Sequence, residues 1–228
     1  MNSLPAIALL TLNFVLGFQD VSIKKEFIKS EDKDKYIRIS LWRPFLDVER
    51  SSSISASQQT SERQKLISAM ALHWKQEGDH LSFDGLGPSI ETQRNFTDFD
   101  LSFEWKIPPK ADFAIFLKGV PGPHFGEPPQ GASEKNKKGS GGLFLNKRFS
   151  PYPSLIADLP PENWNRTRIR MRGDRVTVWL NGQQVVEGIP LENSWDRRKP
   201  VPTEGPIGLQ GRGTPFQVRN MTIHPLEP

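Results

Sequence analysis

The chain contains no cysteine among its 228 residues. This absence excludes disulfide bonds, zinc sites built from thiolates and catalysis by a thiol nucleophile. Stability must therefore come from a packed core, which a single domain of this length with 36% hydrophobic residues can form. Histidine is scarce as well, and its positions show none of the spacings that are typical of a metal site: His73, His80, His124 and His224.

Long hydrophobic runs are absent too. Residues 4–16 are uncharged and mostly apolar, but a membrane-spanning helix needs about 20 such residues. The run has the length of the apolar part of a signal peptide, so we expect residues 1–17 to be a leader and the protein to be exported to the periplasm or the extracellular space. A buried first strand or an ordinary tail is the alternative, because no lysine or arginine precedes the run.

Strong charge of one sign is also missing, since the formal net charge is +4. The sequence has no continuous basic stripe of the kind that follows a phosphate backbone, and we therefore expect no nucleic-acid partner. Four arginines alternate with other residues in one segment, and we interpret them as the solvent-facing side of a strand: Arg166, Arg168, Arg170 and Arg172.

Residues 18–70 differ from the rest of the chain and are interpreted as an N-terminal extension with a linker. They are mixed in charge, with a possible strand at residues 36–42 and a Ser/Gln-rich linker at residues 51–60. Ser61 and Gln64 fit a capping box, and apolar residues follow at helical spacing. This pattern predicts one short helix.

From residue 71 onward the hydrophobic period is two, and residues 99–107 are typical of a strand with one dry and one wet face. The turn dipeptides Gly173-Asp174 and Asn181-Gly182 predict two hairpins. A change of phase predicts a bulge near Asn220. Further strands are expected at residues 80–84, 89–93, 113–117, 142–146, 207–211 and 216–223. Many short strands with turns between them predict a β-sandwich or a barrel.

An ordered set of short motifs spans residues 71–226. The motifs are WKQEG at 74–78, FDLSFEWKI at 99–107, GSGGLF at 139–144, ENWN at 162–165, VTVWLNG at 176–182, LENSWDR at 191–197, GPIGLQ at 205–210 and RNMTI at 219–223. In this order and spacing they resemble the 3-keto-disaccharide hydrolase family. Any one motif would be a weak signal, but the ordered set is specific.

The resemblance implies a concanavalin-like jelly roll. We therefore expect an all-β, jelly-roll β-sandwich over residues 71–228, with one short helix N-terminal to it. The activity it implies is a hydrolase or lyase reaction on 3-keto-disaccharides or 3-keto-glycosides. A ketone at carbon 3 acidifies the hydrogen on carbon 2, so a base can remove it and the enolate can expel the group on carbon 1. Such a site needs a base, a cation or metal for the enolate oxygen, and an acid for the leaving group.

The chain departs from the family pattern in several places. Residues 111–114 (ADFA) stand where the family usually has Asn-Ser-Gly, and Lys118 replaces an arginine. Residues 120–130 contain too many prolines for a central strand, although the family has an acidic, strand-like segment there. Arg212 and Gly213 replace the usual His-Gly. We expect substrate contacts at these positions.

Six residues are candidates for the site. The candidate catalytic acid and base are Glu104, on the polar face of its strand, and Asp196, in a loop rich in polar side chains. The candidates for substrate binding are Lys118, Trp195, Gln210 and Arg212. Cations can hold an enolate, an indole ring can stack on a sugar face, and an amide both donates and accepts hydrogen bonds.

Each candidate also has an ordinary structural explanation: a solvated strand carboxylate, a surface charge, or an aromatic anchor for a loop. His124, in the proline-rich segment, could gate a cleft or bind a metal, but a lone loop histidine usually does neither. No metal ligands can be assigned. A divalent cation such as calcium, held by carboxylates and loop carbonyls, is left as an alternative.

Three functions fit the sequence, and the enzyme is favoured. An enzyme acting on 3-keto sugars predicts a carboxylate with a raised pKa opposite a cation in a cleft. A non-catalytic carbohydrate-binding module predicts an open groove with exposed aromatic side chains and no such pair. A structural or assembly domain of the cell surface predicts neither. Carbohydrate is the expected partner in the first two cases, and the sequence leaves the oligomeric state undetermined.

Overall fold

The computed structural model describes residues 38–45, 55–127 and 139–227. The expected leader and much of the expected N-terminal extension lie outside these residues. None of the helices in the described ranges is long and apolar enough to cross a membrane.

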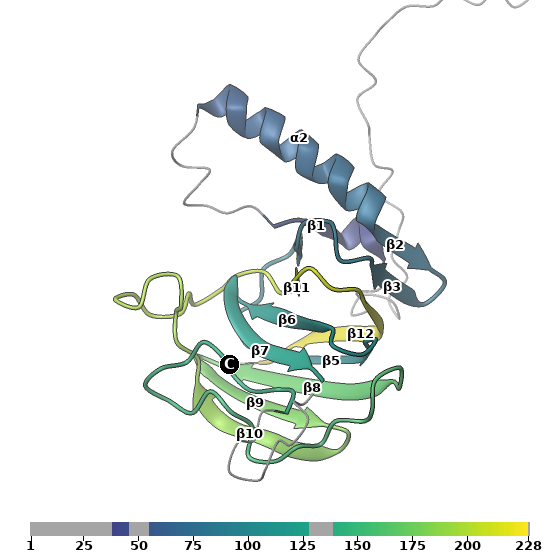
Figure 1. Ribbon diagram of the computed structural model, residues 1–228. Helices are drawn as coiled ribbons and strands as arrows, with labels where there is room; N and C mark the ends of the chain where they lie inside the picture. The colour runs from purple at the N-terminus through teal and green to yellow at the C-terminus, as the bar shows by residue number, and fades with distance from the viewer. Residues whose placement is uncertain (1–37, 46–54, 128–138, 228) are drawn as a thin grey trace, which may run out of the picture. The chain divides into compact units, whose positions relative to one another are not determined.

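Two antiparallel sheets pack into a sandwich (Figure 1). The five-stranded sheet has the order β1-β4-β11-β6-β7, with strands Trp42–Pro44, Ile90–Thr92, Gly208–Gly211, Asp112–Leu117 and Val120–Gly126. The seven-stranded sheet has the order β10-β9-β8-β5-β12-β3-β2, with strands Gln183–Pro190, Arg175–Leu180, Asn165–Arg172, Phe99–Lys106, Phe216–Pro225, His80–Phe83 and Trp74–Glu77. This arrangement confirms the predicted all-β, jelly-roll type of sandwich.

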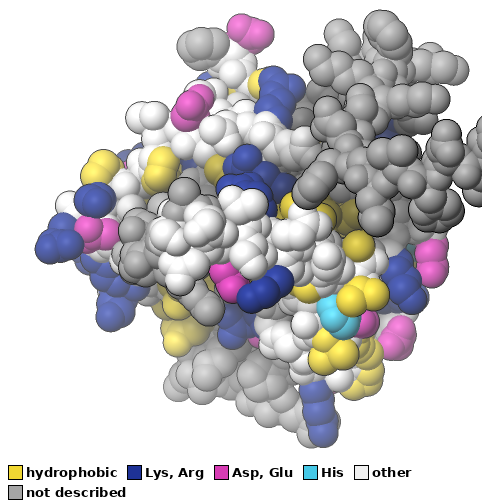
Figure 2. All heavy atoms as spheres, turned by 90° about the horizontal axis from the view of Figure 1, so that it is seen from above, with side chains coloured by type: hydrophobic (Ala, Val, Ile, Leu, Met, Phe, Trp, Pro, Cys, Tyr) yellow, Lys and Arg dark blue, Asp and Glu magenta, His cyan; other side chains and the backbone are white. Residues whose placement is uncertain are grey.

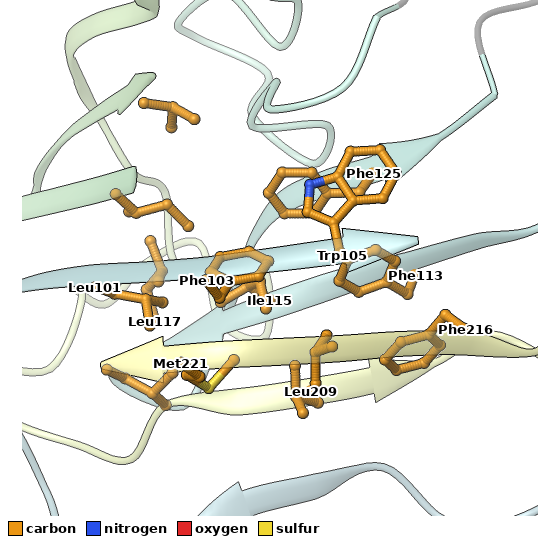
Figure 3. Packing of buried hydrophobic residues seen from close by; sticks show 14 of the residues in the cluster. Leu101, Phe103, Trp105, Phe113, Ile115, Leu117, Phe125, Leu209, Phe216 and Met221 are labelled. Atoms are coloured by element: carbon orange, nitrogen blue, oxygen red, sulfur yellow. The ribbon is translucent and has the colours of Figure 1, made fainter. Parts of the chain in front are cut away.

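The core lies between the sheets and follows from the period-two pattern. Alternate side chains of β5 and β6 contribute to it (Figure 3): Leu101, Phe103, Trp105, Phe113, Ile115 and Leu117. At one end the ring of Phe113 stacks on Phe216 and Phe125, with centroids 4.5 and 5.0 Å away. The Trp105 indole N–H donates to Thr167 Oγ1 at 2.9 Å, so its burial leaves no unsatisfied donor.

The predicted turns are confirmed. Gly173 joins β8 to β9 with φ 58°, and Asn181 and Gly182 join β9 to β10 with φ 50° and 83°. Positive φ at both central residues is the turn geometry that Asn-Gly favours. The bulge in β12 is present as well, because the register against β5 shifts beside Asn220, which has φ 51°.

The predicted arginine stripe lies on the outer face of the seven-stranded sheet as part of an ion-pair network. The Asp100 carboxylate accepts hydrogen bonds from Arg168 (Nε 2.7 Å, Nη2 2.6 Å) and from Arg170 (Nη2 2.9 Å). Both guanidinium groups also lie against the ring of Trp179, at 4.9 and 5.9 Å. On the face of the molecule seen in Figure 2, Lys and Arg side chains are likewise interspersed with Asp and Glu.

The helix α2 (Ala56–His73) lies outside the sheets, and its C-terminal end leads into β2 (Figure 1). Its N-cap is Ser55 rather than Ser61: Ser55 Oγ accepts from the Gln58 N–H at 3.4 Å, and Gln58 Oε1 accepts from the Ser55 N–H at 2.9 Å. The predicted linker is therefore wrong for residues 56–60. A second Ser-x-x-Gln box lies inside the Ser/Gln-rich stretch and starts the helix earlier.

Two predicted strands also need correction. The described part of residues 36–42 forms a 3-10 turn at Ile39–Leu41 that leads into β1. Residues 142–146 form turns instead of a strand. Gly141, with φ 95°, donates its N–H to the His124 carbonyl at 2.7 Å and so places this segment beside β7 without a regular ladder.

The proline-rich segment is a strand, β7, but it lies at an edge of the five-stranded sheet. This position agrees with the expectation that it is not a central strand. Proline lacks an N–H group, and an edge strand tolerates that loss because one of its sides has no ladder to complete.

The helix cap gives a direct test. Ser55→Ala removes the side-chain acceptor of the first turn and should destabilise the start of α2 by about 1 kcal/mol. Amide hydrogen exchange of residues 58–62 should become about fivefold faster, as an energy of this size implies. Ser61→Ala is the matched control and should leave exchange unchanged. A larger effect of Ser61→Ala would contradict the assigned helix start.

The Asp100 network gives a second test. Burial raises the pKa of Asp100, but the hydrogen bonds from Arg168 and Arg170 outweigh it and hold the pKa below the ordinary 3.8. The stabilisation is therefore present above the ordinary pKa and is lost as the pH falls through the folded value. Asp100→Asn should lower the free energy of unfolding by about 1.5–3 kcal/mol at pH 7.

The difference between Asp100→Asn and wild type, measured by urea unfolding, should shrink below pH 4. Glu187→Gln, which changes an exposed carboxylate on strand β10 of the same sheet, should change stability by less than about 0.5 kcal/mol. A pH-independent difference for Asp100→Asn would show that packing rather than charge pairing is responsible.

Candidate functional site

Polar and titratable side chains gather on the outer face of the five-stranded sheet. Asp112 Oδ2 accepts a hydrogen bond from His124 Nε2 at 2.8 Å and a second one from Arg212 Nε at 2.7 Å. These three side chains come from β6, from β7 and from the residue that follows β11. We call Asp112, His124 and Arg212 the polar triad.

Strand register explains why these residues meet. β6 lies between β11 and β7, and Ala114 pairs with Gln210 on one side and with His124 on the other. Alternate residues of a strand face the same side, so Asp112 shares the outer face with Ala114 while Phe113 enters the core. Ala114 itself is fully buried.

The protonation pattern of the triad follows from its hydrogen bonds. Burial raises the pKa of Asp112, but the hydrogen bonds from His124 and Arg212 outweigh it, so the pKa lies below its usual value. A charged carboxylate only accepts hydrogen bonds, and His124 Nε2 must therefore carry a hydrogen. In the neutral imidazole this leaves the lone pair on Nδ1, which has no hydrogen-bond partner among the described residues.

An open hollow of about 340 Å³ lies against His124 and Arg212 of the triad. This volume is at the lower end of the range of about 300–1,000 Å³ for small-molecule pockets. Its polar wall contains His124, Glu127 and Arg212, and its apolar wall contains Phe144, Tyr152 and neighbouring prolines. The Phe144 ring lies 5.3 Å from the His124 ring and 5.2 Å from the Arg212 guanidinium carbon. Such a mixture of walls suits an amphipathic ring such as a sugar.

Gln210 contributes an unused acceptor to the same face. Its side-chain Oε1 is buried and has no hydrogen-bond partner in the described structure. A buried amide oxygen without a partner is uncommon in folded proteins. Gln210 and His124 pair with the same residue, Ala114, but Gln210 does not line the hollow.

An aromatic group lies on the outer face farther along β6. The Trp195 ring is 6.3 Å from Phe45 and 6.1 Å from Phe116, and its indole N–H donates to the Gly119 carbonyl at 2.8 Å. Trp195 is 52% exposed, so the ring is both anchored and accessible. The two explanations given for Trp195 from the sequence, a loop anchor and an exposed platform, therefore both describe part of its environment.

Two carboxyl groups near this face have raised pKa values. Burial raises the pKa of Glu91, against the opposing effect of Arg43, whose Nε lies 2.8 Å from Glu91 Oε1 across β1 and β4. Burial also raises the pKa of Asp158, which accepts from the Ser140 N–H at 3.1 Å. The Glu91–Arg43 pair has the combination of raised pKa and facing cation that the enzyme interpretation predicts, but it does not line the hollow.

Three of the candidates from the sequence lie elsewhere. Lys118 is 2% exposed and donates to the Gly173 carbonyl at 2.8 Å, so it ties the β6–β7 turn to the β8–β9 turn. Glu104 lies on the outer face of the seven-stranded sheet. Its carboxylate accepts from Arg219 at 2.8 Å and from Arg166 at 3.2 Å.

Asp196 lies in the loop before β11 and is held by Arg198 and Lys199. The hydrogen bonds from Arg198 lower the pKa of Asp196 to about 2. A carboxylate with so low a pKa is a weak base at neutral pH. The structure thus brings Gln210 and Arg212 together on one face and does not bring Glu104, Asp196 or Lys118 to them.

The triad contains two residues that were not among the candidates. Asp112 and His124 were considered only as a departure from the family pattern and as a lone loop histidine. The signal that could have found them is the coincidence of three departures, at residues 111–114, 120–130 and 212. These departures meet in space as the triad. Within the described ranges no group of three or more His, Asp or Glu side chains lies close enough together to hold a metal ion.

Solved structures of other proteins share this architecture. A candidate glycosyl hydrolase from Parabacteroides distasonis ATCC 8503 aligns with a TM-score of 0.54 at 22% identity, covering 67% of this chain and 74% of that one. A second candidate glycosyl hydrolase from this bacterium aligns with a TM-score of 0.50 at 19% identity, covering 68% of this chain and 84% of that one. At these identities the likeness shows the fold alone. No curated protein matches the chain.

A family model extends this likeness to the sequence. It describes 3-keto-alpha-glucoside-1,2-lyase-like domains and matches residues 57–224, which is well over half of the chain. The matched range begins in α2, ends in β12 and includes all three residues of the triad. The resemblance drawn from the motifs is thereby confirmed, and the chain belongs to the family of 3-keto-alpha-glucoside-1,2-lyase-like domains.

Proposed function

We propose that the protein cleaves the glycosidic bond of 3-keto-glucosides by elimination, with the triad as its catalytic centre. The observation that carries this proposal is the pair of hydrogen bonds on Asp112 Oδ2, which leaves a free Nδ1 on His124 and a cation beside it. Membership of the family supports the substrate class. The hollow of about 340 Å³ supplies a place for the sugar.

The first step is removal of the proton on carbon 2. His124 Nδ1 accepts this proton, and the electrons of the C2–H bond form the C2–C3 double bond of an enolate, with the negative charge on the oxygen at carbon 3. Asp112 orients the imidazole and stabilises the positive charge that it acquires, which is the usual role of a carboxylate behind a histidine base.

The second step breaks the bond between carbon 1 and the leaving oxygen. The enolate electrons form the C1–C2 double bond, the carbonyl at carbon 3 is restored, and the proton on His124 passes to the leaving oxygen. The hydrolytic product then forms when water adds across the double bond, with the hydroxyl group on carbon 1 and the proton on carbon 2. His124 thus serves first as base and then as acid.

Arg212 suits the role of stabilising the enolate. Its Nε is occupied by Asp112, but its two terminal nitrogens have no hydrogen-bond partner among the described residues. A guanidinium fork that is fixed at one edge presents its other N–H groups in a defined direction.

A non-catalytic sugar-binding module is the second candidate function. The observation that favours it is the anchored, half-exposed Trp195 with Phe45 and Phe116 beside it. Aromatic rings of this kind bind the apolar face of a sugar without any chemistry. The two functions differ in one measurable respect, because only the enzyme requires the free imidazole nitrogen of His124.

Turnover of 3-keto-trehalose or 3-keto-lactose tests the proposal. Wild type should release the free sugar, and His124→Gln should lower kcat/KM by at least about 100-fold, the usual range for loss of a general base. His73→Gln is the matched control, since His73 also forms a pair with an aspartate at 2.8 Å but lies at the end of α2. Its kcat/KM should equal that of wild type.

Two further variants distinguish the triad from the catalytic residues that were expected from the sequence. Glu104→Gln and Asp196→Asn should leave turnover in place, because both carboxylates lie apart from the triad. If either variant abolishes turnover while His124→Gln does not, the triad is not the catalytic centre. Saturable binding of the sugars to wild type without turnover would favour the binding module instead.

A further inference from the structure

The segment from Phe149 to Pro153 places an exposed aromatic ring at the hollow. Tyr152 is 54% exposed, lies between two prolines and lines the hollow together with Arg212 and His124. Its phenol oxygen has no hydrogen-bond partner among the described residues. An exposed tyrosine with a free hydroxyl group does not contribute to the core, so its side chain is available to a ligand.

Local contacts fix the backbone of Tyr152. The Ser150 hydroxyl donates to the Tyr152 carbonyl at 3.2 Å, and Ser150 Oγ accepts from the Tyr152 N–H at 3.3 Å. The flanking prolines restrict the backbone further, because each has a fixed φ. Beyond them, the Ser154 N–H donates to the Val185 carbonyl of β10 at 2.7 Å, which anchors the end of the segment to the other sheet.

The segment is also packed directly behind the strand of His124. A Cβ atom on Gly142 would lie 2.5 Å from the Pro151 carbonyl oxygen and 2.9 Å from Pro153 Cδ, so only glycine fits there. The carbonyl of the same glycine accepts from the His124 N–H at 3.0 Å. The backbone positions of the Tyr152 segment and of His124 are therefore linked through one residue.

The residues that line the hollow differ in exposure. His124 is half-buried, whereas Tyr152 is 54% exposed and marks a more open end of the hollow. In the proposed reaction the oxidised ring has to place carbons 2 and 3 at His124 and Arg212. A ring that contacts Tyr152 at the more open end is then the next ring of the substrate, the one attached through the leaving oxygen.

We infer that Tyr152 is the platform that binds the leaving-group sugar and so gives the enzyme a preference for disaccharides over simple 3-keto-glycosides. The apolar face of a pyranose ring packs on the aromatic ring, and the free phenol can bind one of its hydroxyl groups. Because the backbone of Tyr152 is held before binding, the segment loses little conformational entropy when the sugar stacks on the ring. The inference rests on the proposed function of the triad for its chemistry, but the binding it predicts can be measured without turnover.

The test compares a disaccharide with a substrate that lacks the second ring. For 3-keto-trehalose, Tyr152→Ala should lower kcat/KM about tenfold, mainly through KM, which corresponds to about 1.4 kcal/mol. For methyl 3-keto-α-glucoside the same variant should match wild type. Tyr152→Phe should keep most of the disaccharide preference. Phe149→Ala, which removes a nearby ring that is 40% exposed and does not line the hollow, should behave as wild type.

If Tyr152→Ala lowers kcat/KM equally for both substrates, or for neither, Tyr152 is not the platform for the leaving-group sugar. Calorimetric binding to His124→Gln, with and without Tyr152→Ala, separates this result from a failure of the proposed chemistry. If wild type shows no turnover but Tyr152→Ala still weakens binding of 3-keto-trehalose about tenfold and leaves methyl 3-keto-α-glucoside unaffected, the platform stands and the lyase activity does not. If binding of the disaccharide does not depend on Tyr152, or is absent, the platform is refuted.

Discussion

Strand β6 packs one face into the core and carries Asp112 on its other face. The position of every other residue of the site depends on this orientation of the strand. Phe113, Ile115 and Leu117 fill the core, and this fixes the rotation of the strand. The alternate residues, beginning with Asp112, must then face outward. Because β6 is paired on both sides, the residues of β7 and β11 beside it are fixed as well. The meeting of His124 and Arg212 at one carboxylate is thus a consequence of core packing.

The two outer faces of the sandwich use charge in different ways. On the seven-stranded sheet the carboxylates of Asp100 and Glu104 are each shared between two arginines, and guanidinium groups cover the Trp179 ring beside them. Such pairs are closed to further partners, because the carboxylate oxygens already accept hydrogen bonds from arginine. On the five-stranded sheet one carboxylate holds two groups whose other nitrogens remain available. The second arrangement leaves hydrogen-bonding capacity for a ligand, and a hollow lies beside it.

Much of the fold could be predicted because it depends on local patterns. The alternation in residues 99–107, the Asn181-Gly182 turn and the phase change near Asn220 are each encoded in a few consecutive residues. The start of α2 was misplaced because two Ser-x-x-Gln boxes occur within ten residues and only the contact between Ser55 and Gln58 is made at the helix end. Propensity cannot decide between two such boxes.

The site could be predicted only in part, because a local sequence pattern does not show which of the two sheets a strand joins. Gln210 and Arg212 were named from the end of their strand, and both lie on the outer face of the five-stranded sheet. Glu104 has the same local pattern, but its strand belongs to the other sheet. As a lone loop histidine His124 is not expected to take part in a site, and its role appears only when the pairing of β6 with the distant strand β11 brings Arg212 to the same carboxylate. Register between distant segments is not contained in any local pattern.

Cleavage in deuterium oxide tests the central claim most directly, since only abstraction at carbon 2 exposes that position to solvent. The 3-keto sugar released from 3-keto-trehalose should carry deuterium at carbon 2 for each bond cleaved, at a rate far above the exchange of the same sugar without enzyme. The leaving sugar should carry no deuterium on carbon. Release of the 3-keto sugar with its original hydrogen at carbon 2 would contradict the proposed elimination and point to direct displacement at carbon 1.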